Sequence, residues 1–167
     1  MNHNLRNNRV SSVAFTALFV VTLLIPSRAD AQIRVGAAFG LDTEIGITAG
    51  YYMPLNVSAV EGLSVGVDGV FYLPETTTVS GQDYTSNFFE VNANGHYPFT
   101  DVSSGSLYAL AGLQYARASV DTPFGDASSS DVGLNLGAGL DFGKFFAEAK
   151  FGLGGFEQLV LSAGLSF

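Results

Sequence analysis

The sequence predicts an all-β protein, an eight-stranded antiparallel up-and-down β-barrel that is transmembrane. Three observations lead to this prediction: a closing segment that alternates between apolar and small or polar residues, seven earlier segments of the same kind, and a composition that is both acidic and apolar. Alternation with a period of two is typical of a β-strand with one apolar face and one polar face.

The closing segment runs from Leu159 to Phe167. Its apolar face holds Leu159, Leu161, Ala163, Leu165 and Phe167, and its other face holds Val160, Ser162, Gly164 and Ser166. An exposed hydrophobic strand at the edge of a soluble sheet invites aggregation. We therefore interpret this segment as the strand that closes a barrel in lipid.

Seven earlier segments repeat the pattern, and each is about 9–12 residues long, which suits a tilted strand that crosses a bilayer. They are Ile33–Leu41, Ile45–Met53, Leu63–Leu73, Phe88–Tyr97, Leu107–Ala118, Val132–Phe142 and Phe145–Leu153. An even number of strands places the N-terminus and the C-terminus of the chain on the same side of the membrane. Among the connections, Pro74–Tyr84 and Asp121–Asp131 are predicted to be outer loops.

Aromatic residues fall at the strand ends that this topology places on the periplasmic rim. They are Tyr51, Tyr97, Tyr108, Phe142, Phe145 and Phe167. Aromatic residues favour strands in general, but they also gather where a membrane meets water. We therefore expect a belt of these six side chains at the rim.

The N-terminal region predicts export. Arg6 and Arg9 precede a short apolar run, Val13–Ile25, and Ala29-Asp30-Ala31 fits the small-x-small pattern of a cleavage site. The run is too short for a membrane-spanning helix, which needs roughly 20 apolar residues. We predict a cleaved signal peptide over residues 1–31, followed by a single barrel domain over residues 32–167.

Composition excludes several classes of function. Removal of residues 1–31 takes away three of seven basic and one of fifteen acidic residues, which leaves a net charge of −10. This balance argues against nucleic acid binding, which needs basic patches. The chain has no cysteine, so disulfides and thiolate metal sites are excluded. At 47 % hydrophobic residues, the chain is also apolar for so acidic a protein.

With the signal-like N-terminus, the eight alternating segments and the terminal Leu165-Ser166-Phe167, the mature chain resembles the small eight-stranded outer-membrane β-barrels of the OmpA/OmpX type. The resemblance implies a location in the outer membrane. It also implies that Leu165 and Phe167 form part of a signal read by the outer-membrane assembly machinery. The resemblance is one of pattern and indicates fold and location better than activity.

Charged residues occupy the polar face of the segments and are predicted to line the lumen. They are Arg34, Asp68, Glu90, Asp141, Glu148 and Lys150, with His96 and several amides beside them. One interpretation is a gate or proton path, and the other is a network of ion pairs that plugs the barrel. An eight-stranded interior is barely wide enough for its own side chains, which favours the plug.

The predicted outer connections are rich in carboxylates. These are Asp42, Glu44, Glu75, Asp83, Asp121, Asp126, Asp131 and Glu157. Their spacing matches no known calcium loop, so we interpret them as solvated acidic loops and expect no metal and no cofactor.

The favoured function is structural, adhesive or concerned with envelope interactions, in a monomer whose partners are outer-membrane lipid and the assembly machinery. An enzyme is not expected, because His96 is the single histidine of the mature chain and its parity points into the lumen. Two alternatives stay open: a lipid-modifying outer-membrane enzyme, and a secreted soluble barrel that binds a small ligand.

Overall fold

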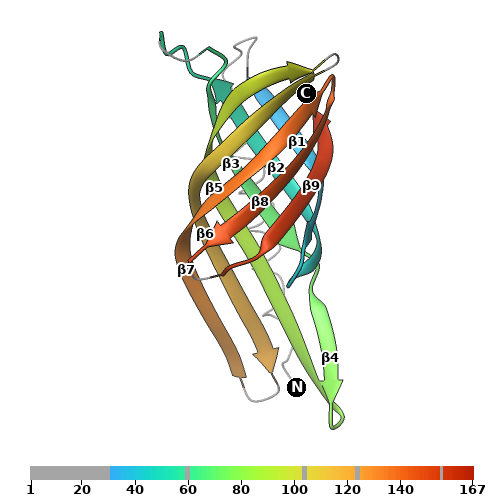
Figure 1. Ribbon diagram of the computed structural model, residues 1–167. Coiled ribbons are helices and arrows are strands. Elements are labelled where there is room, and N and C mark those ends of the chain that lie inside the picture. Colours follow the sequence, from blue (N-terminus) through green and yellow to red (C-terminus); the bar gives the residue numbers. More distant parts are fainter. Residues whose placement is uncertain (1–30, 59–60, 103–104, 123–124, 155) are drawn as a thin grey trace, which may run out of the picture.

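The computed structural model describes residues 31–58, 61–102, 105–122, 125–154 and 156–167. The predicted signal peptide lies outside these residues, apart from Ala31. No helix in the described ranges is long and apolar enough to cross a membrane. The described residues form nine β-strands in one antiparallel sheet (Figure 1).

The strands are β1 (Gln32–Gly40), β2 (Glu44–Pro54), β3 (Ser64–Tyr72), β4 (Glu75–Val79), β5 (Gln82–Val102), β6 (Gly105–Thr122), β7 (Gly125–Phe142), β8 (Phe145–Leu153) and β9 (Leu159–Ser166). Strands that are neighbours in sequence pair with one another, except β3 and β4; β1 pairs with β9, and β3 pairs with β5 to close the ring. Eight strands thus form the closed barrel, while β4 pairs only with β5. The predicted fold class is confirmed.

Five of the eight predicted segments agree with their strands to within one residue at each end. The other three strands are much longer than predicted, because β5, β6 and β7 continue past the barrel. The predicted loop Pro74–Tyr84 is wrong: its residues form β4 and the start of β5, joined by a tight turn at Ser80-Gly81. Both turn residues have positive φ, 54° and 77°, as the two-residue hairpin turns favoured in antiparallel pairs require.

The predicted loop Asp121–Asp131 is also wrong in large part. The register of β6 with β7 continues without a break from Leu107↔Leu140 to Thr122↔Gly125. Both corrected segments consist mainly of Thr, Ser, Val and Asp residues, which carry little apolar alternation. The β-branched residues still favour a strand, and cross-strand hydrogen bonding extends the sheet where the pattern gives no sign of it.

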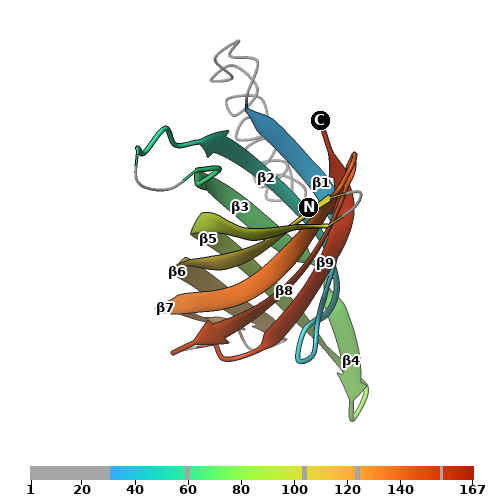
Figure 2. The ribbon, with the colours of Figure 1, turned by 45° about the horizontal axis from the view of Figure 1, so that its top comes forward.

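The barrel has two different ends. At the terminal end, where β1 begins and β9 ends, β7 and β8 are joined by the short turn Gly143-Lys144. At the other end, called the hairpin end here, β4, β5, β6 and β7 extend beyond the ring as a protruding sheet (Figures 1 and 2). The two ends therefore present different surfaces to their surroundings.

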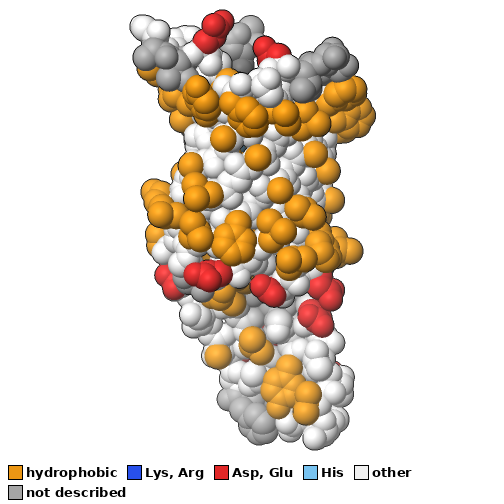
Figure 3. All heavy atoms as spheres, in the orientation of Figure 1, with side chains coloured by type: hydrophobic (Ala, Val, Ile, Leu, Met, Phe, Trp, Pro, Cys, Tyr) orange, Lys and Arg blue, Asp and Glu red, His pale blue; other side chains and the backbone are white. Residues whose placement is uncertain are grey.

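Apolar side chains cover the outside of the barrel. Ile47, Val67 and Leu136 are each more than half exposed, whereas their strand neighbours Thr48 and Asp68 are buried. Figure 3 shows large apolar residues gathered in two bands around the barrel, with acidic residues beyond the band nearer the protruding sheet. This arrangement is the reverse of a soluble ligand-binding barrel, whose apolar face would point inward.

The expected aromatic belt is correct in part. Tyr97, Phe142, Phe145 and Phe167 are exposed at the terminal end. Tyr108 was expected in the same belt but points into the lumen, where only 3 % of it is exposed. Its even-numbered position in β6 gives it the parity of the polar face, and that parity decides its direction.

Glycines make room inside the barrel for the tyrosines. A Cβ atom at Gly139 would overlap the ring of Tyr108, and one at Gly66 would overlap the ring of Tyr52. Each of these two rings therefore lies over a glycine that is its cross-strand partner on the neighbouring strand.

Candidate functional site

The lumen is filled by polar side chains from every strand of the ring except the protruding parts. Asn92, Asn135 and Glu90 are 0–1 % exposed, and Asn94, Lys150 and Gln114 are nearly as buried. Burying such groups is costly unless they pair with one another. The contacts among these groups thus define the site.

Asp68 on β3 is the hub of the central network. Its carboxylate accepts hydrogen bonds from Asn94 Nδ2 at 2.7 Å, Tyr52 Oη at 2.8 Å, Asn92 Nδ2 at 2.9 Å and Lys150 Nζ at 3.4 Å. Each carboxylate oxygen receives two donors, which uses the lone pairs that such an oxygen offers. A buried Asp68 is thereby held by donors from three other elements of the barrel.

Glu90 on β5 extends the network toward the hairpin end. Its Oε1 accepts hydrogen bonds from Gln158 Nε2 at 2.6 Å and Tyr72 Oη at 3.1 Å. Its Oε2 lies 3.8 Å from Lys150 Nζ. Lys150 is therefore an ion-pair partner of two buried carboxylates, Asp68 and Glu90.

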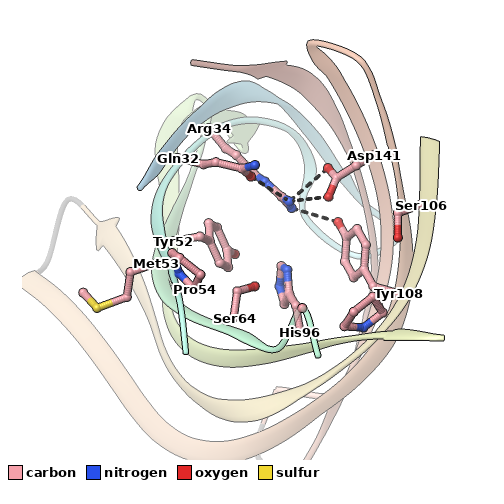
Figure 4. A pocket seen from close by; sticks show the side chains of 12 residues that line it. Gln32, Arg34, Tyr52, Met53, Pro54, Ser64, His96, Ser106, Tyr108 and Asp141 are labelled. Carbon is pink, nitrogen blue, oxygen red and sulfur yellow. Dashed lines mark hydrogen bonds and ion pairs between the residues drawn. The ribbon is translucent and has the colours of Figure 1, made fainter. Parts of the chain in front are cut away.

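A second network lies at the terminal end (Figure 4). Arg34 Nη2 donates to both carboxylate oxygens of Asp141, at 2.8 and 2.9 Å, and Arg34 Nη1 donates to Tyr108 Oη at 2.9 Å. Tyr108 donates in turn to Glu148 Oε2 at 3.1 Å. Strands β1, β6, β7 and β8 are thus tied together across the mouth.

Stacked rings separate the terminal mouth from the central network. His96 lies between Tyr52 and Tyr108, with ring centroids 4.4 and 4.5 Å apart. The Arg34 guanidinium lies 4.7 Å from the Tyr52 centroid and 5.4 Å from that of Phe146, within the range of cation–π attraction. These contacts bring side chains from β1, β2, β5, β6 and β8 together between the mouth and the central network.

A cavity of about 180 Å³ lies at the terminal mouth, beside these side chains. Gln32, Ser64, Ser106 and Met53 belong to its lining, together with the stacked rings. A second cavity of about 10 Å³ lies between Asp68 and Glu148, which is room for about one water molecule. Neither cavity has a lining that reaches from one end of the barrel to the other.

The charges of the lumen do not balance one to one. Four carboxylates, Asp68, Glu90, Asp141 and Glu148, face two cationic side chains, Arg34 and Lys150. Within the described residues, the basic group nearest Glu148 is His96, whose Nε2 lies 3.8 Å from Glu148 Oε2. Lys150 therefore offsets the negative charge of more than one buried carboxylate.

The described residues give little support to catalysis. Neither ring nitrogen of His96 has a hydrogen-bond partner among them. Ser64 is the cross-strand neighbour of His96, yet no hydrogen bond joins the two side chains, as a nucleophile and its base would require. No group of three or more His, Cys, Asp or Glu side chains in the described ranges is placed to hold a metal ion.

All six charged residues predicted for the lumen line it in the structure, but in two groups. Asp68, Glu90 and Lys150 meet at the centre, and Arg34, Asp141 and Glu148 are linked through Tyr108. The sequence interpretation missed the tyrosine hydroxyls and Gln158. The sequence contained a usable signal for the tyrosines. Tyr52, Tyr72 and Tyr108 stand at positions that face the same side of the sheet as the charged residues on the same or neighbouring strands.

A closed eight-stranded antiparallel barrel with an apolar exterior and a polar interior is the architecture of the small outer-membrane β-barrels, and the fold belongs to that class. No protein-family model and no curated protein matches the chain. Three solved structures share the fold.

The first is Ail, the attachment invasion locus protein of Yersinia pestis, in complex with the heparin analogue sucrose octasulfate: TM-score 0.56, 22 % identity, covering 83 % of this chain and 98 % of that one. The second is Neisserial surface protein A, with a TM-score of 0.54, 20 % identity and coverage of 82 % and 93 %. The third is the N-terminal β-barrel domain of Pseudomonas aeruginosa OprF, with a TM-score of 0.54, 18 % identity and coverage of 84 % and 98 %.

Replacing Lys150 by Met should strongly destabilise the barrel, because it leaves Asp68 and Glu90 buried without their shared cation. The expected loss is about 3–5 kcal/mol of unfolding free energy, as for one partner of a buried ion pair. Urea titration of the protein refolded in detergent measures it.

Adding Glu90→Gln to Lys150→Met should restore part of the loss, since one uncompensated charge is removed. Arg117→Met is the control, because Arg117 is exposed and such changes stay within about 0.5 kcal/mol. Equal stability of Lys150→Met and the unaltered protein would contradict the central role of Lys150.

Proposed function

We propose that this protein is an exported outer-membrane barrel that works as an adhesive or envelope-interaction protein, without enzymatic activity and as a monomer. The observation that carries the proposal is the protruding sheet. It continues the barrel wall as a rigid extension and leaves a strand edge open to a partner. The terminal end then faces the periplasm and the hairpin end faces outside, because outer-membrane barrels have short periplasmic turns and longer outer extensions.

The exterior supports a location in lipid. Apolar residues cover the barrel wall, and aromatic residues flank them at the terminal end, as expected where a membrane meets water. Acidic residues follow beyond the opposite band (Figure 3). A chain with the reverse distribution would suit the soluble ligand-binding alternative.

The protruding sheet has two free edges, one on β4, which pairs only with β5, and a longer one on β7. Residues 126–132 pair with β6, and the register with β8 begins only at Leu134. All seven are exposed, and none is Pro or Lys, the residues that commonly protect a free edge. An extended peptide can add to such an edge through main-chain hydrogen bonds.

Charge selects the kind of peptide. The protruding sheet carries Glu75, Asp83, Asp121, Asp126 and Asp131 against the single described cation Arg117. A basic extended segment complements this surface. A polyanion such as the heparin analogue bound to Ail does not.

Proline substitution on β7 tests the open edge. Of two successive strand residues, one presents its backbone groups to β6 and the other to the free edge. We expect one of Ser129→Pro and Ser130→Pro to weaken binding of a fluorescent peptide of alternating Lys and Thr about fivefold to tenfold, the effect of one or two lost hydrogen bonds.

The other proline variant should disturb the β6–β7 pairing, which circular dichroism detects. A peptide of alternating Glu and Thr is the matched control and should bind poorly. If both variants bind the basic peptide as well as the unaltered protein, addition of the peptide to the edge of β7 is wrong.

The sealed lumen is the second part of the proposal. The stacked layer of Tyr52, His96 and Tyr108 and the network around Asp68 fill the barrel, so we expect no stable ion-conducting openings in planar-bilayer recordings. A Tyr52→Ala/Tyr108→Ala variant removes two rings of the layer and should raise the conductance. Large, stable openings from the unaltered protein would contradict the plug.

Phe167 is proposed to act in assembly, together with Leu165. The backbone of Phe167 also closes the barrel, because it exchanges hydrogen bonds with Ile33 at 2.8 and 3.1 Å. Phe167→Ala keeps these bonds and removes the exposed ring. We expect reduced surface levels in cells, with unchanged heat-modifiable gel mobility after refolding in detergent; deletion of Phe167 should impair both. Normal surface levels of Phe167→Ala would exclude a role of the ring.

A further inference from the structure

The connection between β2 and β3 is unusual for the terminal end. It comprises residues 55–63, whereas β7 and β8 are joined by Gly143-Lys144 alone. Its described residues lie beside the barrel wall, away from the mouth (Figures 1 and 2). The described part of it, residues 55–58 and 61–63, therefore projects beside the barrel.

The part of this connection next to β2 is apolar, exposed and uncharged. Residues 53–58 read Met-Pro-Leu-Asn-Val-Ser, and Met53, Leu55 and Val57 are 43 %, 36 % and 45 % exposed. The conformation is fixed by backbone hydrogen bonds, from Leu55 N to Leu63 O at 2.7 Å and from Val57 N to Leu55 O at 3.0 Å. A solvated loop has no need of this run of exposed apolar side chains.

The segment is continuous with the apolar rim of the barrel. Tyr97 and Phe99 on β5 are exposed by 51 % and 54 %, and β5 is the neighbour of β3. The returning end of the connection lies against the same strand, because a Cβ atom at Gly62 would touch Pro98. The connection therefore begins at Met53 on the exposed apolar face of β2 and returns beside the strand that carries the rim aromatics.

We propose that residues 53–58 lie in the headgroup region of the periplasmic leaflet and anchor the barrel there, with Leu55 and Val57 inserted among the phospholipids. This inference rests on the proposed outer-membrane location. The occupant is phospholipid, because the surface continues the lipid-facing rim. The segment has no basic residue, so its contact with lipid is hydrophobic and independent of salt.

Tryptophan fluorescence tests the anchor directly, because the chain contains no Trp. The variants Leu55→Trp and Val57→Trp each introduce a single reporter into the full chain, reconstituted in phosphatidylcholine vesicles. Leu136→Trp reports the lipid-facing wall, and Ser129→Trp reports the aqueous side on the protruding sheet. Heat-modifiable gel mobility shows that each variant is folded.

We expect Leu55→Trp and Val57→Trp to show a blue-shifted emission, loss of fluorescence with lipids brominated near the headgroup, and weak quenching by iodide, at low and high salt alike. Ser129→Trp should show the opposite. If Leu136→Trp is quenched by brominated lipid but both loop reporters respond only to iodide, the anchor is wrong and the membrane location stands. If Leu136→Trp is not quenched either, the proposed location itself is overturned.

Discussion

The arrangement of side chains in the interior follows from the width of the barrel. An eight-stranded barrel has room for side chains but not for a column of bulk water. Charges placed inside must therefore find their partners within the chain. Asp68 meets this requirement with donors from β2, β5 and β8. Because the donors come from separate strands, the network ties the barrel across its axis, in addition to the ladder that runs around its wall.

The same constraint explains the pairing of glycines with large rings. Tyr108 reaches both Arg34 and Glu148 because Gly139, its cross-strand partner on β7, leaves space for its ring. A side chain at that position would displace the ring and break the link between the mouth and Glu148. Gly139 and Gly66 are thus required by the rings that lie over them in the lumen.

The sequence was sufficient for the ring of eight strands, because burial on one face imposes strict alternation there. It was insufficient for β4 and the outer part of β7, whose faces are both exposed, and for the outer part of β6, which is largely half-buried. Neither face of such a strand is selected for apolar residues, so the alternation disappears. Parity placed the six charged residues in the lumen. Parity did not show which carboxylates pair with Lys150, because that depends on strand register and on how far each side chain reaches across the barrel.

The protruding sheet is mechanically part of the barrel. Strand β5 carries Glu90, Asn92 and Asn94 in the lumen and continues without a break in chain to its pairing with β4. Strands β6 and β7 likewise remain in register from the ring to the turn at the tip. The edge of β7 is therefore held in an extended conformation before any partner arrives. Ordering a flexible loop would oppose binding by its lost entropy. A pre-ordered edge avoids that cost, which supports the proposed addition of a basic strand through main-chain hydrogen bonds.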